Sequence, residues 1–130
     1  MSADDSRVRL LVVEDEQSIR RLCMTVGGAL GFHCSEAESA EAALELIRNA
    51  AEKIDLLITD VVMPRLDGPG LVREVREIRS DMKVIFISGY AEDAFRQHLD
   101  SDSDIDFLPK PFSLKQLATK VKEVIGADPI

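Results

Sequence analysis

Four side chains able to take part in chemistry stand directly after apolar segments of this 130-residue sequence. Asp60 ends the run DLLITD, Glu14 and Asp15 follow LLVV, and Lys110 follows FLP. Three carboxylates within about 5 Å would repel by roughly 3 kcal/mol per pair at an effective dielectric of about 20, so they must be protonated, exposed or bridged by a cation. Oxygen ligands without His or Cys favour Mg²⁺ over zinc. The set predicts magnesium-assisted transfer of a phosphoryl group onto an aspartate.

Asp60 opens the loop VVMPRLDG, and its carboxylate is the expected nucleophile, which would form an acyl phosphate. The ammonium of Lys110 would hold one phosphoryl oxygen, and the hydroxyl of Ser88 could donate a hydrogen bond to another. Each residue alone has a simpler interpretation. Asp60 could be a solvated loop residue or a helix cap, Lys110 part of a turn, Ser88 a satisfied hydroxyl, and Glu14 with Asp15 the negative charges that favour a helix start. Their joint occurrence at strand ends favours the chemical interpretation.

Apolar runs typical of strands alternate with helical patterns along the whole chain. The strand-like runs cover residues 8–13, 32–36, 54–59, 83–88 and 105–109. A helical pattern follows each run, and the one over residues 91–99 is the shortest and least regular. Parallel strands need crossover connections, which are usually helical, so the alternation predicts an α/β fold with a doubly wound, five-stranded parallel sheet. Ligands of such sheets bind beyond the carboxyl ends of the strands, where the candidate residues stand.

Local signals predict where several helices begin and end. Gly31 is suited to end the first helix, and Ser39 to cap the second. Pro69 suits the first turn of the third. Ser113 with Gln116 three positions later forms a capping box before the last helix.

Composition narrows the classes of protein further. The length fits one domain spanning residues 1–130, with a core of about 8–125. The 24 acidic against 16 basic residues give a net charge of -8, which opposes direct binding to nucleic acid or anionic membranes. No apolar stretch approaches the ~20 residues that span a bilayer. Cys23 and Cys34 are expected to be reduced thiols of a cytoplasmic protein, and Cys23 to pack in the core.

Four segments resemble a known family in order and spacing. VVEDE, LLITDVVMPRLDG, FISGYA and FLPKPF are similar to the acid pair, phosphoacceptor loop, switch-hydroxyl strand and Lys-Pro motif of response-regulator receiver domains. The resemblance covers about residues 8–125 and implies the flavodoxin-like (βα)5 receiver fold. The segments FISGYAEDAFR and DIDFLPKPFSLKQLA are similar to receivers at the end of alphaproteobacterial cell-cycle hybrid histidine kinases.

The resemblance implies a role for each matched residue of the metal site. Glu14 and Asp15 match the family's metal-binding acids, and Asp60 matches the phosphoacceptor. Val62 matches the position whose main-chain carbonyl completes the Mg²⁺ shell. Glu14 departs from the Asp that is also common there, which changes the reach of the side chain and could make its metal contact water-mediated.

The resemblance also implies a conformational switch. Ser88 matches the switch hydroxyl, Phe107 the aromatic rotamer switch and Lys110 the family lysine, followed by an expected cis peptide at Pro111. Phe107 stands where Tyr is an alternative, so its movement cannot end in a phenolic hydrogen bond. Val62 and Tyr90 would flank the phosphoryl pocket, where they could tune the lifetime of the adduct or simply pack.

These matches imply a phosphorelay receiver that takes a phosphoryl group from a histidine kinase or a histidine phosphotransfer protein. The added charge would bias the surface made by the helix over residues 91–99, the strand over 105–109 and the last helix, and so control a downstream protein. We expect a protein that promotes its own phosphorylation and dephosphorylation without being a turnover enzyme, and a monomer when unphosphorylated.

Three other interpretations compete with this one. An aspartate-nucleophile phosphatase would need an acid two residues after the nucleophile, where Val62 stands. A receiver-like interaction module that no longer takes phosphate would lack an acid, the nucleophile or the lysine, and none is missing. The run DSDSDID resembles the start of a calcium loop, but Ile105 replaces the required glycine and Pro111 the final Glu.

Overall fold

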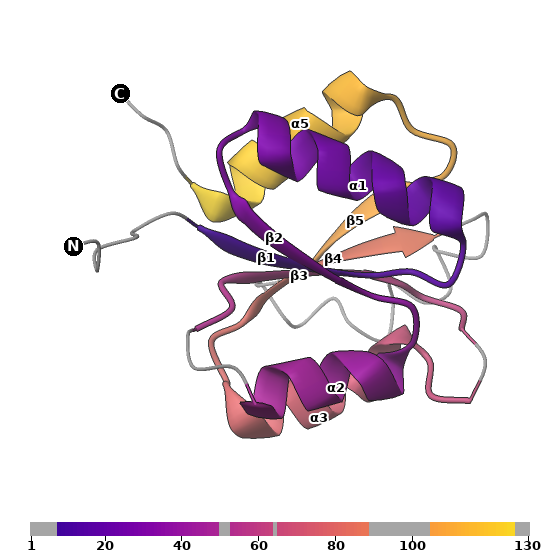
Figure 1. The fold of residues 1–130 in the computed structure, drawn as a ribbon, viewed down its shortest axis with the longest axis vertical. Coiled ribbons are helices and arrows are strands. Elements are labelled where there is room, and N and C mark those ends of the chain that lie inside the picture. Colours follow the sequence, from indigo (N-terminus) through magenta and orange to yellow (C-terminus); the bar gives the residue numbers. More distant parts are fainter. Residues whose placement is uncertain (1–7, 50–52, 64, 89–104, 127–130) are drawn as a thin grey trace.

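The computed structural model describes residues 8–49, 53–63, 65–88 and 105–126. Five strands form one parallel sheet in the order β2-β1-β3-β4-β5, which confirms the predicted α/β fold (Figure 1). The strands are β1 Arg9–Val13, β2 His33–Ala37, β3 Leu56–Asp60, β4 Lys83–Ser88 and β5 Ile105–Pro109. The described helices are α1 Gln17–Ala29, α2 Ala40–Asn49, α3 Gly68–Ile78 and α5 Leu114–Ile125. The helix predicted over residues 91–99, Tyr90 and residues 100–104 of the rejected calcium loop lie outside the described residues.

The helices cover both faces of the sheet. α1 and α5 lie on one face, and α2 and α3 on the other (Figure 1). Alternate residues of β1 enter opposite layers: Leu11 and Val13 pack toward α2 and α3, whereas Leu10 and Val12 pack toward α1 and α5. All four side chains are buried, because a parallel strand between two helical layers has no face left for water.

The strand register brings the ends of the central strands to one level. Val13 of β1 pairs with Thr59 of β3, so Glu14 and Asp60, the next residues, leave the sheet side by side. Asp60 in turn pairs with Ile87 of β4. The winding of the sheet therefore joins two acidic segments that are far apart in the sequence.

Most predicted helix signals act as expected. Gly31, with φ 85°, follows the end of α1. The Ser39 hydroxyl accepts a hydrogen bond from the Ala42 amide at 3.1 Å, and Pro69 lies in the first turn of α3. The capping box of Ser113 and Gln116 is formed in full at the start of α5.

Five strand boundaries, in β1, β2 and β3, differ from the prediction by one or two residues, and the starts of β2 and β3 have local reasons. β2 begins one residue late because the amide of Phe32 donates to the carbonyl of Gly27, which places Phe32 in the turn after α1. β3 begins at Leu56 because the side chain of Asp55 accepts a hydrogen bond from the amide of Arg9 at 2.8 Å. This contact fixes Asp55 immediately before the first residue of the strand.

Both cysteines are free thiols. Cys23 is buried in the layer of α1 and α5, which confirms its predicted packing role, and burial raises the pKa of its thiol to about 12. Burial also raises the pKa of Cys34. Among the described helices, none combines the length and apolarity needed to cross a membrane.

Candidate metal and phosphoacceptor site

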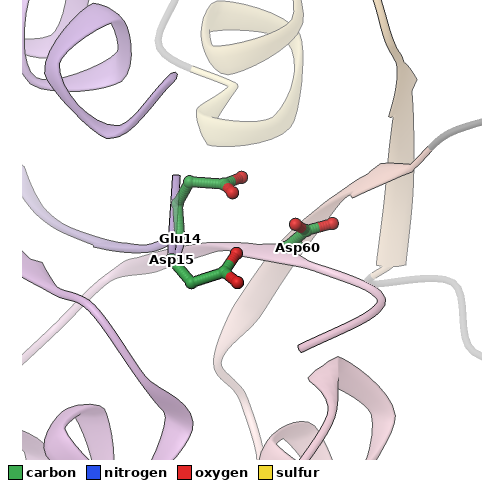
Figure 2. Close-up of side chains that lie close together, drawn as sticks. All are labelled: Glu14, Asp15 and Asp60. Atoms are coloured by element: carbon green, nitrogen blue, oxygen red, sulfur yellow. The ribbon is translucent and has the colours of Figure 1, made fainter. Parts of the chain in front are cut away.

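Three carboxylates meet at the carboxyl end of the sheet. One oxygen each of Glu14, Asp15 and Asp60 lies within 4.8 Å of the other two. Figure 2 shows the carboxyl groups of Glu14 and Asp15, from the end of β1, directed toward the side on which Asp60 lies at the end of β3. Glu14 is fully buried, Asp60 is 7% exposed, and Asp15 is exposed. The predicted convergence of these acids is confirmed.

Lys110 reaches the same site from the end of β5. Its Nζ lies 3.3 Å from Oδ2 of Asp60 and 3.8 Å from Oε1 of Glu14. The Lys110–Pro111 peptide is cis, as predicted. One ammonium therefore faces two of the three acids, and the site as a whole carries an excess of negative charge.

Burial and a neighbouring charge act against the ionised form of Glu14. Burial, followed by the nearby charge of Asp60, raises the pKa of Glu14 to about 8 despite the opposing effects of the Glu16 amide and Lys110. Its Oε1 is buried without a hydrogen-bond donor among the described residues. A buried acceptor of this kind, in an all-oxygen set of ligands, fits a hard divalent cation such as Mg²⁺, which would favour the ionised carboxylate.

The interpretation of Glu14 as part of a helix start also holds in part. The N-cap of α1 is Glu16, whose side chain makes no capping hydrogen bond within the described structure. The amide of Glu16 instead donates to Oε2 of Glu14 at 3.1 Å. Oε2 of Glu14 thus accepts a hydrogen bond at the start of α1, and Oε1 faces Lys110.

The loop after Asp60 depends on a glycine that sequence reasoning missed. A Cβ atom on Gly68 would lie 2.3 Å from the main-chain oxygen of Asp60 and 2.9 Å from the ring of Phe86. The amide of Gly68 donates to the carbonyl of Val61 at 2.9 Å, which closes the loop. The Asp67-Gly68 pair at the start of α3 was the available sequence signal. Val62, in this loop, has a 75% exposed side chain.

The residues assigned to the switch lie on β4 and β5. Ser88 ends β4 and pairs with Pro109, but its side chain is outside the described part of the structure. Phe107 is buried, and its ring stacks on Phe86 with 5.8 Å between centroids. In this conformation the aromatic side chain points into the core.

Comparison with known proteins identifies the family to which this chain belongs. Residues 10–122 match the family described as the response regulator receiver domain, and the chain belongs to this family. Receiver domains are parts of two-component systems and interact with histidine kinases or phosphotransfer proteins. The flavodoxin-like fold, predicted from the resemblance, agrees with this assignment.

Particular relatives place the chain within the family. It is 48% identical over 116 residues to the sensor kinase CckA of Brucella abortus, covering 89% of this chain and 12% of that protein. It is 34% identical over 119 residues to the response regulator receiver protein CpdR of the same organism, covering 92% of this chain and 98% of that protein. The chain thus spans a small part of one relative and nearly all of the other.

Solved structures show the same arrangement. The receiver domain of the hybrid histidine kinase CckA matches with a TM-score of 0.75 and 36% identity, over 90% of this chain and 98% of that one. A receiver domain protein from Clostridium thermocellum matches with a TM-score of 0.82 and 25% identity, over 92% and 94% of the two chains. The expected similarity to hybrid-kinase receivers is confirmed.

Proposed function

We propose that Asp60 accepts a phosphoryl group from a phosphohistidine donor with the help of Mg²⁺. The observation that carries this proposal is the cluster of Glu14, Asp15 and Asp60 within 4.8 Å, with Lys110 Nζ 3.3 Å from the phosphoacceptor. The donor would be a histidine kinase or a histidine phosphotransfer protein.

Each residue has a part in the transfer. Glu14, Asp15, Asp60 and the main-chain carbonyl of Val62 would hold the ion, which when bound offsets negative charge on the transferring phosphoryl group. A free oxygen of the Asp60 carboxylate attacks phosphorus as the bond to the donor imidazole breaks, which leaves an acyl phosphate on Asp60. The ammonium of Lys110 then exchanges its contact with Asp60 for a phosphoryl oxygen and stabilises the charge gathered there.

The added charge also supports a proposed switch. Ser88 would turn its hydroxyl toward the phosphoryl group, and Phe107 would move into the space that Ser88 leaves. The stacked position of Phe107 on Phe86 supplies the starting state. The surface that changes would include residues 91–99, β5 and α5. Moving a population from 1:99 to 99:1 takes about 5.5 kcal/mol, within reach of charge-assisted hydrogen bonds plus metal contacts.

The remaining parts of the proposal concern cellular setting. The protein promotes its own phosphorylation and dephosphorylation without turning over a separate substrate, and acts through a downstream protein. It is a monomer when unphosphorylated. We place it in the cytoplasm, which its free thiols support.

Intact-mass measurement after incubation with acetyl phosphate and Mg²⁺ tests the proposal. The wild type should gain one phosphoryl group, and Asp60→Asn should gain none. Asp81→Asn is the matched control, because Asp81 is an exposed aspartate before β4, at the opposite end of the sheet, and should keep the adduct. EDTA should suppress the reaction.

The other outcomes point to other functions. Catalytic release of phosphate from many substrates would indicate a phosphatase. A wild type that gains no phosphoryl group would refute the proposal and indicate a phosphorylation-independent interaction module.

A further inference from the structure

Arg20, on the first turn of α1, connects the acidic loop, meaning the segment after β1 that carries Glu14 and Asp15, to strand β2. Its Nη1 donates to the main-chain carbonyl of Glu14 at 2.7 Å, and its Nε donates to Oε1 of Glu36 in β2 at 3.0 Å. The Arg20 side chain is 14% exposed and that of Glu36 is 49% exposed. The guanidinium is therefore partly buried and held by two acceptors, one of them a carboxylate.

The carbonyl that Arg20 binds belongs to the peptide that links Glu14 to Asp15, two of the candidate metal ligands. The amide of Glu14 donates to the carbonyl of Ala37 at 3.1 Å, which continues the pairing of β1 with β2 beyond Val13. Glu14 is thus fixed at its amide by β2 and at its carbonyl by Arg20. Rotation of the Glu14–Asp15 peptide would change the direction in which the Asp15 side chain leaves the main chain.

Asp15 has the greatest need of such support. Glu14 is buried and Asp60 nearly so, and packing restricts both side chains. Asp15 is exposed, so the direction of its carboxylate depends chiefly on its main chain. A charged donor with a forked geometry suits this task, because one guanidinium can bind a carbonyl and a carboxylate at once.

We propose that Arg20, oriented by Glu36, is a positioning residue that sets the Glu14–Asp15 peptide for divalent-metal binding. This inference rests on the proposed function, because it assumes that the acids hold Mg²⁺. Arg20 contacts neither the ion nor phosphate in this role, and it acts through the main chain of its two ligands.

Mg²⁺ affinity separates positioning from simple electrostatics. Arg20→Met removes a positive charge near three carboxylates, which by charge alone would tighten cation binding. Loss of positioning has the opposite sign: outer-shell partners of metal ligands typically contribute 10-fold or more, so we expect about 10-fold weaker Mg²⁺ binding. Affinity is read from amide chemical shifts of Asp15 and Asp60 during titration with Mg²⁺. Without Mg²⁺, amides of the acidic loop should exchange faster in Arg20→Met.

Arg21→Met is the matched control, since Arg21 is the next residue of α1 and is exposed. It should bind Mg²⁺ as the wild type does or slightly more tightly. Equal weakening by Arg21→Met and Arg20→Met would overturn the inference. Glu36→Gln should weaken Mg²⁺ binding in the wild type but change nothing in the Arg20→Met background, because Glu36 acts through Arg20.

The outcomes distinguish this inference from the proposed function. A wild type that binds no Mg²⁺ and accepts no phosphoryl group defeats the proposed function. A wild type that does both, with an Arg20→Met variant of unchanged Mg²⁺ affinity, overturns only the role of Arg20. If Arg20→Met does not fold, Glu36→Gln decides, and unchanged affinity in that variant also overturns it.

Discussion

At the scale of single residues, the charge of Asp60, the proposed phosphoacceptor, is expected to lower the stability of the protein. This charge helps to raise the pKa of the buried Glu14, and the ammonium of Lys110 must serve both acids. Without a divalent ion, the protein therefore holds the charge of Asp60 close to the exposed carboxylate of Asp15 and, above the raised pKa of Glu14, close to a second negative charge. Removing one of them should relieve that repulsion.

We predict that Asp60→Asn is more stable than the wild type in EDTA. Repulsion of roughly 3 kcal/mol per close pair, reduced by the loss of the Lys110 contact, suggests a gain of about 1 kcal/mol in the free energy of unfolding. Saturating Mg²⁺ should narrow the gap, because it stabilises the wild type more. Urea unfolding in EDTA and in Mg²⁺ measures both quantities.

Glu45→Gln, a change at an exposed acid of α2, provides the control and should alter stability by less than about 0.5 kcal/mol. A less stable Asp60→Asn in EDTA would show that the Lys110–Asp60 contact outweighs the repulsion.

The sequence predicted the acids and the lysine because each follows an apolar run whose end is easily recognised. It did not predict the roles of Arg20 and Gly68. Arg20 donates to the main-chain oxygen of Glu14, and Gly68 leaves room for the main-chain oxygen of Asp60, and such main-chain contacts carry no sequence signature of their own. Ser88 and Phe107 could be placed on strands, but the movements proposed for them depend on a second state that one sequence pattern does not describe.

At the scale of elements, the close approach of α3 to the end of β3 depends on the absence of a side chain at Gly68. A Cβ there would meet the main chain of Asp60, which cannot move without disturbing the sheet. Gly28 in α1 is different, because a Cβ there would meet nothing within 4 Å. The two glycines form a natural pair for comparison.

We predict opposite effects for alanine at these positions. Gly68→Ala should lower the free energy of unfolding by about 1–3 kcal/mol through overpacking, and should also slow phosphorylation by acetyl phosphate because it displaces Asp60. Gly28→Ala should raise the free energy of unfolding by about 0.5–1 kcal/mol, since alanine restricts the unfolded chain and favours the helix. Thermal and urea unfolding test the pair, and a neutral Gly68→Ala would contradict the argument.

Element types were predictable because each rests on local periodicity. The boundaries of β2 and β3 were less so, because Phe32 is drawn into the turn after α1 and Asp55 is tied to Arg9. Such contacts depend on which strands become neighbours. The order of the strands is itself a property of the assembled sheet.

At the scale of the whole molecule, the central strands link two helical layers. Leu71 of α3 is fully buried in the layer of α2 and α3, and Leu117 of α5 in the layer of α1 and α5. Strand β1 contributes to both layers. We therefore expect the described structure to unfold as a single cooperative unit.

Leu71→Ala and Leu117→Ala should each lower the free energy of unfolding by about 2–5 kcal/mol, because each leaves a cavity in a packed layer. Urea unfolding followed by circular dichroism should show one transition for both variants. Amide hydrogen exchange should accelerate in the slowest-exchanging strands of both. Acceleration confined to the layer that contains the substitution would contradict the expected cooperativity.

The position of β5 at the border of the sheet has a further consequence. Lys110 follows this outermost strand, whereas the acids follow the two interior strands β1 and β3. Local unfolding generally starts at an edge strand, so Lys110 would leave the site before the three acids do. Brief detachment of β5 would leave Asp60, the proposed nucleophile, without its counter-charge, and the proposed phosphoacceptor activity would lapse while most of the protein stayed folded.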